Sequence, residues 1–136
     1  MRSKTKAQIF ITDDDPDDRA FIINALERDG FRGKLVEFEN GQLLANHLHK
    51  YPDNLPDLIL LDLNMPVKNG FDTLQELKTD NNFNEIPVIV ISASTKKEDE
   101  QFCFQAGCDH FLSKPLDMEG YNILARFVGS VFFRES

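Results

Sequence analysis

Carboxylate groups follow two apolar runs of this chain, at the point where each run ends. The run at residues 58–61 ends on Asp62, and the three aspartates at 13–15 follow the run at residues 9–12. Like charges gathered in one place need an offset, which can be a raised pKa, a divalent cation or a nearby lysine. Lys114, at the end of a third run, is a candidate for that lysine. The expected chemistry is that of an acidic pocket balanced by a cation.

Five strand-like runs alternate with five helix-like segments and would hold these residues in place. Pro16 suits the first turn of the first helix, Gly30 suits its end, and Gly107 suits a left-handed cap after the fourth. We expect strands at residues 9–12, 34–38, 58–62, 88–92 and 109–112, and helices at 17–29, 41–50, 71–79, 96–105 and 117–132.

Alternating strands and helices predict an α/β fold, a doubly wound parallel sheet with helices on both faces. The two natural strand orders are the dinucleotide-binding one and the flavodoxin-like one, 2-1-3-4-5. No G-x-G-x-x-G follows the first strand, which weakens the dinucleotide-binding alternative. A flavodoxin-like (βα)5 fold is therefore expected. Its order sets the first and third strands side by side, so Asp13, Asp14 and Asp62 would share one crevice.

Length and composition narrow the function classes. With 136 residues, the chain has room for one domain, residues 1–136, with residues 1–6 expected as a flexible N-terminal tail. The net charge of −8 argues against direct binding of nucleic acid. No apolar run approaches the ~20 residues that span a membrane, so no membrane contact and a cytoplasmic location are expected. Cys103 and Cys108 fit neither a redox nor a zinc motif and are expected to be buried free thiols.

Motif residues stand at four predicted strand ends. They are Asp13 and Asp14 after the first strand, Asp62 with Asn64-Met65-Pro66 and Gly70 after the third, Ser92-Ala93 after the fourth, and Lys114-Pro115 after the fifth. In this combination the chain resembles a response-regulator receiver domain of two-component signalling over nearly its whole length. The resemblance implies a stand-alone receiver that takes part in a phosphorelay.

The resemblance also implies the roles of the acidic residues. Asp62 would accept a phosphoryl group from a sensor histidine kinase or a phosphotransfer protein. Asp14 and Asp62 would bind Mg²⁺ directly, Asn64 through its backbone carbonyl and Asp13 through a water, a ligand set that suits this hard cation. Lys114 would reach the phosphoryl oxygens as a point charge.

Neighbouring residues leave details of the site open. The register within Asp13–Asp15 is uncertain by one residue, with Asp15 the less favoured ligand. Asp17 and Asp18 are interpreted as acids that favour the start of a helix and not as ligands. The family often has a cis bond between its lysine and the following proline, and Lys114–Pro115 permits one.

Two further residues match the switch positions of the family. Ser92 would bond a phosphoryl oxygen through its hydroxyl, and Phe111 takes the place of an aromatic residue that rotates between inward and outward positions. Phosphorylation would then change a surface of the fourth helix, fifth strand and fifth helix, where a downstream protein target binds. Phe102 is expected on this surface, which is also a candidate homodimer interface; Phe132 and Phe133 are assigned to it less firmly.

Such a receiver is not an enzyme, since it acts only in its own phosphorylation and dephosphorylation. Family behaviour suggests that Asn64 and Ser94 affect the access of the water that removes the phosphate. One rival is a magnesium-dependent phosphatase or phosphotransferase with an aspartate nucleophile, but such enzymes usually carry a second acid where Asn64 stands. The other rival is a receiver-like scaffold that accepts no phosphate.

Overall fold

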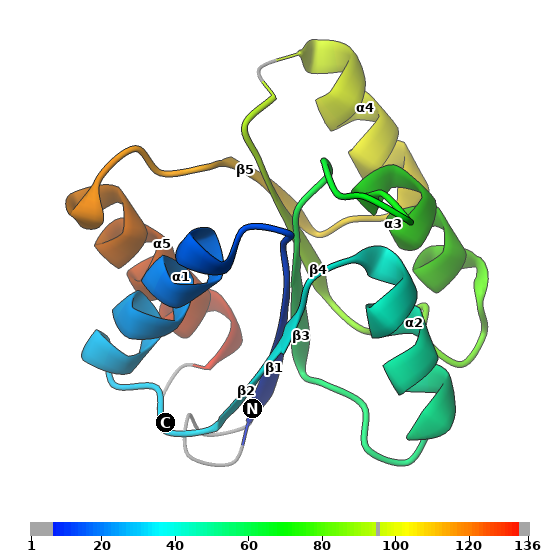
Figure 1. Cartoon of the computed structure of the whole chain (residues 1–136), viewed down its shortest axis with the longest axis horizontal. Helices are drawn as coiled ribbons and strands as arrows, with labels where there is room; N and C mark the ends of the chain where they lie inside the picture. Colours follow the sequence, from blue (N-terminus) through cyan, green and yellow to red (C-terminus); the bar gives the residue numbers. More distant parts are fainter. Residues whose placement is uncertain (1–6, 95, 134–136) are drawn as a thin grey trace.

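The computed structural model describes residues 7–94 and 96–133, and within them five parallel strands form a single sheet flanked by helices (Figure 1). The sheet order is β2-β1-β3-β4-β5, which confirms the flavodoxin-like prediction. The elements in chain order are β1 (Gln8–Thr12), α1 (Pro16–Arg28), β2 (Lys34–Phe38), α2 (Gly41–Lys50), β3 (Leu58–Leu61), α3 (Gly70–Thr79), β4 (Val88–Ser92), α4 (Lys97–Ala106), β5 (His110–Ser113) and α5 (Met118–Phe132).

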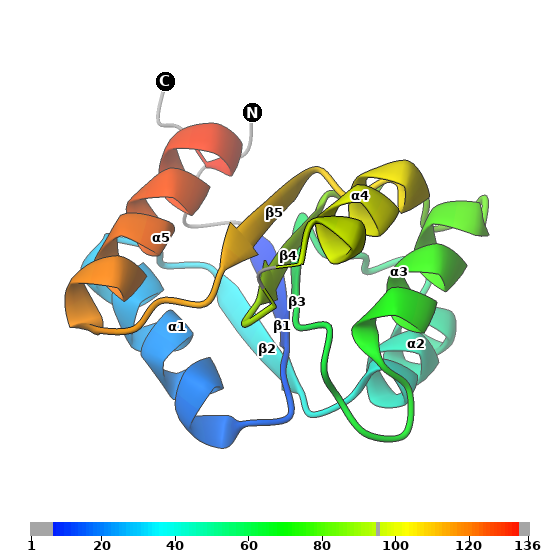
Figure 2. The ribbon, with the colours of Figure 1, turned by 90° about the horizontal axis from the view of Figure 1, so that it is seen from above.

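Helices cover both faces of the sheet, with α1 and α5 on one side and α2, α3 and α4 on the other (Figure 2). Each face has its own apolar core. Neighbouring residues of β1 divide between them: Ile9 and Ile11 pack under α1 and α5, whereas Phe10 packs under the other helices. Because successive side chains of a strand point to opposite faces, a strand buried on both sides is mainly apolar, without alternation between apolar and polar residues. This explains the unbroken apolar runs in β1, β3 and β4.

Side-chain caps fix where several helices begin. Asp15, Asn40, Asn69 and Asp117 precede α1, α2, α3 and α5, and each side chain accepts a backbone N–H of the first turn. Gly107 ends α4 with a left-handed φ of 110°, as its position in the sequence predicts. These caps set the strand-to-helix loops at the carboxyl ends of the strands.

Seven of the ten elements differ from their predicted bounds by one residue at one end or at both, while β2, α2 and β4 match. The thiols of Cys103 and Cys108 are free and buried, as predicted. In the part of the chain that the structure describes, no helix is long and apolar enough to cross a membrane.

The assignment of aromatic residues to an exposed surface is wrong for one of them. Phe133 is only 1% exposed, and its ring packs against that of Phe31. Phe102 is 38% exposed and therefore outside the core, although its ring lies 5.4 Å from that of Phe71 on α3. Phe104 is exposed as well. One buried face of α4 could not hold both Phe102 and Phe104, and both of them are exposed to solvent.

Candidate functional site

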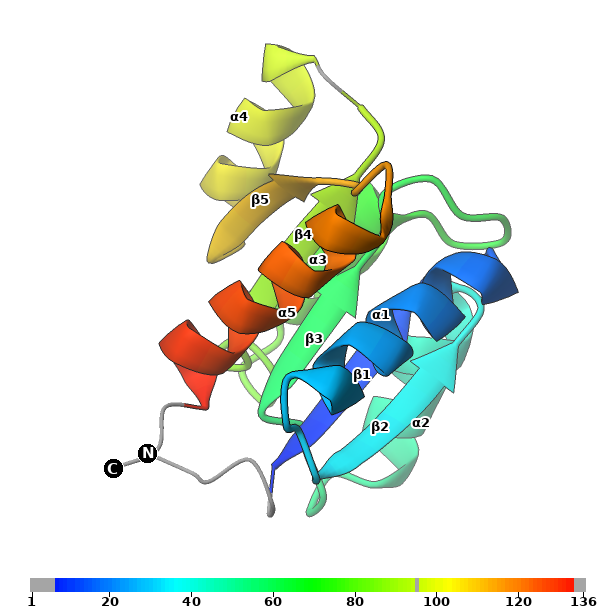
Figure 3. The same ribbon diagram turned by 90° about the vertical axis from the view of Figure 1, so that its left-hand side faces the viewer.

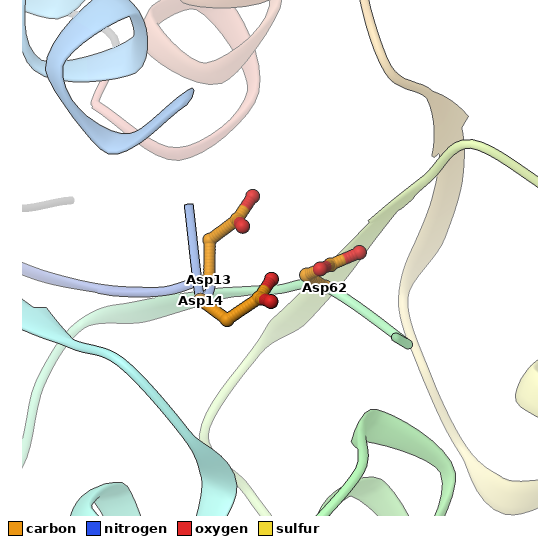
Figure 4. A group of neighbouring side chains, drawn as sticks. All are labelled: Asp13, Asp14 and Asp62. Atoms are coloured by element: carbon orange, nitrogen blue, oxygen red, sulfur yellow. The ribbon is translucent and has the colours of Figure 1, made fainter. Parts of the chain in front are cut away.

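Three carboxylates meet at the carboxyl ends of β1 and β3. Oxygen atoms of Asp13, Asp14 and Asp62 all lie within 4.8 Å of one another, although about 50 residues separate the two segments (Figure 4). Asp13 and Asp62 are buried, and Asp14 is exposed at the mouth of the group. The predicted convergence of these acids at the ends of the first and third strands is therefore confirmed.

Backbone hydrogen bonds hold two of these acids in place. The Asp62 N–H donates to the carbonyl of Thr12 at 2.9 Å, which continues the pairing of β3 with β1. The Asp13 N–H donates to the carbonyl of Phe38 at 3.0 Å and continues the pairing of β1 with β2. Both residues therefore extend the sheet by one position, and their backbones are held by its hydrogen bonds.

Lys114 supplies the cation that the sequence suggested. Its Nζ lies 2.8 Å from Asp18 Oδ2, 3.0 Å from Asp13 Oδ2 and 3.5 Å from Asp62 Oδ2. Its backbone N–H donates to the Ser92 carbonyl, which ties the end of β5 to the end of β4. Burial alone would lower the pKa of Lys114, but its hydrogen bonds to Asp18 and Asp13 raise it, so the ammonium stays charged.

The pocket holds more negative charge than Lys114 neutralises. Burial, and then repulsion by Asp13, raise the pKa of Asp62 from 3.8 to about 6, against the opposing effect of Lys114. Burial also raises the pKa of Asp13, although the backbone N–H of Asp15 and Lys114 act in the opposite direction. Both shifts express the cost of keeping carboxylates ionised together in a buried place.

This donor set fits a hard divalent cation. Carboxylate oxygens from three residues converge, and Mg²⁺ prefers oxygen ligands, often one or two carboxylates with several waters. Asp14 is exposed, so water reaches one side of the group. A cation there would also relieve the repulsion that raises the pKa of Asp62.

The remaining acids of the first loop have other partners. Asp15 caps α1 by accepting the Asp17 N–H at 2.9 Å, whereas Asp13 and Asp14 belong to the converging group. Asp18 lies in the first turn of α1 and outside the converging group, as its interpretation as a helix-start acid expects, but its carboxylate is also the nearest partner of Lys114, which the sequence did not indicate. Asp17 is exposed in the first turn, as that interpretation expects.

The loop between β3 and α3 is braced against both neighbouring helices. The Lys68 carbonyl accepts the Gly41 N–H at the start of α2, and the Lys68 ammonium pairs with Glu76 on α3. Gly70 packs directly against the backbone of Asp62, where a Cβ would collide with the carbonyl oxygen. Val67 is 83% exposed and holds a left-handed φ of 66°, which is strained for a β-branched residue. Asn64 is exposed in the same loop.

The two predicted switch residues differ in burial. Ser92 is fully buried at the end of β4, and its Oγ accepts the Ser94 N–H at 3.0 Å; Ser94 Oγ in turn donates to Asp99 at 2.5 Å. Phe111 is half-buried and packs against the core under α2, α3 and α4. The Lys114–Pro115 bond is trans, so the cis bond that the resemblance permitted is not formed.

The family model of the response regulator receiver domain matches residues 9–124. This chain belongs to the receiver family. Receivers are signalling domains and not enzymes in the classical sense. The match covers every residue of the carboxylate group and Lys114, so the pocket lies inside the family's common fold.

Two of the similar proteins are named as transcriptional regulators. The DNA-binding dual master transcriptional regulator RpaA of Synechocystis is 37% identical over 120 residues, which cover 88% of this chain and 46% of RpaA. KdpE, the KDP operon transcriptional regulatory protein of Escherichia coli, is 36% identical over 107 residues, which cover 79% of this chain and 44% of KdpE. The chain thus spans about half the length of these relatives.

The fold is also similar to solved receivers. The phosphorylated cyanobacterial phytochrome response regulator RcpA superimposes with a TM-score of 0.87 at 27% identity, covering 93% of this chain and 94% of RcpA. The Mn(2+)-bound form of response regulator Rcp1 gives a TM-score of 0.85 at 23% identity and covers 96% of each chain, which shows a common fold.

Sequence reasoning finds most of this receiver's pocket but misses Asp18. The acids and the lysine of the pocket, Asp13, Asp14, Asp62 and Lys114, are visible in the sequence because they follow strand-like runs. Asp18 carries no such signal, because its contact with Lys114 depends on how the first turn of α1 faces the end of β5. The Lys68–Glu76 pair is missed as well, because it depends on how the loop before α3 lies against that helix.

Proposed function

We propose that this receiver domain accepts a phosphoryl group on Asp62. A carboxylate oxygen of Asp62 would attack the phosphorus of a phosphohistidine on a sensor histidine kinase or phosphotransfer protein. The new O–P bond forms as the N–P bond breaks, and the electron pair of that bond returns to the imidazole. The observation that carries this proposal is the convergence of the buried Asp62 carboxylate with Asp13, Asp14 and Lys114.

The charge of the transferring group must be balanced for this reaction to proceed. Asp13, Asp14 and Asp62, with the backbone carbonyl of Asn64, would hold Mg²⁺, which when bound supplies positive charge to the phosphoryl oxygens. Lys114 lies 3.5 Å from Asp62 and needs little movement to donate to a phosphoryl oxygen. Because this lysine stays protonated, it provides a fixed positive charge throughout the transfer.

Phosphorylation would then act on a partner surface. The backbones of Ser92 and Lys114 are joined by a hydrogen bond. A phosphoryl group that accepts hydrogen bonds from both side chains would therefore act on the ends of β4 and β5 together. Phe111 lies on β5 with a half-buried ring that packs against the core, and this ring would change its packing after phosphorylation. The face of α4, β5 and α5 would carry the change to a downstream protein or to a second copy of the chain.

Intact-mass measurement tests the phosphoacceptor. The purified chain is treated with acetyl phosphate, with Mg²⁺ or with EDTA, and compared with Asp62→Ala and with the exposed-site control Asp53→Asn. We expect one added phosphoryl group in the unaltered chain and the control when Mg²⁺ is present, and none in Asp62→Ala. An equal modification of Asp62→Ala would refute the assignment.

The same experiment separates the rivals. A scaffold would gain no mass under any condition. A phosphatase would release phosphate from a small ester such as p-nitrophenyl phosphate in many turnovers and lose that activity in Asp62→Asn. In contrast, a receiver consumes acetyl phosphate only as fast as its own aspartyl phosphate is lost to water, and we propose that Asn64 and Ser94 influence that rate.

A further inference from the structure

Asp18 on α1 makes the shortest contact of Lys114. An ammonium group has three N–H donors, and three carboxylates surround this one, with Asp18 at 2.8 Å ahead of Asp13 and Asp62. Asp18 and Lys114 are each about one-fifth exposed at the side chain, so water screens this pair only in part. Figure 3 shows α1 and α5 side by side on this face of the sheet, with the first turn of α1 near the carboxyl ends of the strands.

The other two partners of Lys114 are also the residues on which a divalent cation depends. Asp13 and Asp62 belong to the converging group that fits Mg²⁺, so the ammonium and the metal compete for the same oxygens and repel each other. Asp18 lies outside that group. It is therefore the one carboxylate of the three that Lys114 keeps when a cation takes the others.

We propose that Asp18 is a positioning residue that gives Lys114 a carboxylate of its own, so that the ammonium and a divalent cation occupy the pocket together. The inference rests on the proposed function and adds a residue to it. The partner of Asp18 is Lys114 and not the neighbouring Arg19. The Arg19 guanidinium donates instead to the Asp13 carbonyl and to Glu37 on β2.

The chain offers a matched control in Asp17. It is the preceding residue in the first turn of the same helix, carries the same charge and is exposed. Replacing either aspartate with asparagine removes one negative charge at the same end of α1. Only the change at Asp18 also removes the ion pair with Lys114.

Calorimetric titration of the full chain with MgCl₂ tests the proposal. Without Asp18, Lys114 relies on Asp13 and Asp62 and competes more strongly with the metal. We expect Asp18→Asn to weaken Mg²⁺ binding about fivefold more than Asp17→Asn does, within the range of coupling between residues of one ion-pair network. In a Lys114→Met background, Asp18→Asn should have no more effect than Asp17→Asn.

Equal effects of the Asp17 and Asp18 substitutions, or a loss that persists without Lys114, would overturn the role of Asp18. The proposed function would still stand, since the unaltered chain binds the metal. If the unaltered chain binds no Mg²⁺, the proposed metal site fails first, and the two failures are thereby distinguished.

A second measurement decides the question if the substituted chains do not fold. In a crystal structure of the unaltered chain with Mg²⁺ bound, Lys114 Nζ should remain within about 3.2 Å of an Asp18 carboxylate oxygen while its contact with Asp13 lengthens. A structure in which Lys114 leaves Asp18 and stays on Asp13 would refute the proposal.

Discussion

Replacing Asp62 with asparagine is expected to stabilise the metal-free fold at neutral pH. Burial of the Asp62 carboxylate and repulsion by Asp13 both disfavour its ionised form. Together these two effects outweigh the attraction of Lys114. Asparagine has nearly the same shape but no charge. The substitution therefore removes the unfavourable electrostatic energy and leaves the packing at the end of β3 in place.

The magnitude follows from the pKa of Asp62. It is about 6 in the folded chain against an ordinary value of 3.8, and each pKa unit corresponds to about 1.4 kcal/mol. The ionised carboxylate thus lowers the free energy of unfolding by about 3 kcal/mol. Because the folded-state pKa is raised, this destabilisation is absent below about pH 4, grows between pH 4 and 6, and is complete above pH 6.

Urea unfolding followed by circular dichroism in EDTA measures the effect. At pH 7.5 we expect the free energy of unfolding of Asp62→Asn to be higher than that of the unaltered chain by about 2–3 kcal/mol. At pH 5 the difference should be clearly smaller. The control Asp53→Asn removes an exposed carboxylate from the loop before β3. Its free energy of unfolding should stay within about 0.5 kcal/mol of that of the unaltered chain at both pH values.

Two results would contradict this reasoning. If Asp62→Asn is less stable than the unaltered chain at pH 7.5, then Lys114 more than compensates the buried charge. If the difference does not change between pH 5 and 7.5, the effect comes from packing and not from ionisation of Asp62.

Three other predictions concern the surroundings of the pocket and the core. Gly70→Ala should lower the free energy of unfolding by about 2 kcal/mol or more in urea denaturation, because the new Cβ collides with the carbonyl oxygen of Asp62; an unchanged midpoint would show that the loop yields. Val67→Gly should raise the free energy of unfolding by about 1 kcal/mol in the same measurement, since glycine adopts the φ of 66° without strain. A loss of stability would contradict this account. Burial raises the pKa of the Cys103 thiol to about 12 and that of Cys108 to about 11, so neither should react with Ellman's reagent at pH 8 until the chain is unfolded.

The fold could be predicted because local signals agree along the chain. Runs that are apolar at every position indicate strands buried on both faces, and β1, β3 and β4 are buried throughout. The edge strand β2 is half-exposed and is still recognised between Gly33 and Asn40. Bounds shift by one residue elsewhere, because a cap such as Asp117 decides where a helix begins and depends on a single side-chain hydrogen bond.

Contacts between helices and distant strands could not be predicted in the same way. Phe133 follows α5 at a position where fraying is common, yet it is buried because α5 brings it against Phe31. Asp18 meets Lys114 because the first turn of α1 faces the end of β5. Such contacts depend on the rotation and position of a whole helix, which no local pattern contains.

The acids between residues 13 and 18 illustrate this limit. Asp13 continues the extended backbone of β1 and points into the pocket, whereas Asp15 turns back to cap the helix that starts at Pro16. Within that helix, successive residues differ in direction by about 100°, so Asp17 faces solvent while Asp18 reaches Lys114. Residues of one type, a few positions apart, thus have separate roles that are set by the change from strand to helix. For this reason the comparison of Asp17 with Asp18 isolates a contact, since composition and charge are the same in both substitutions.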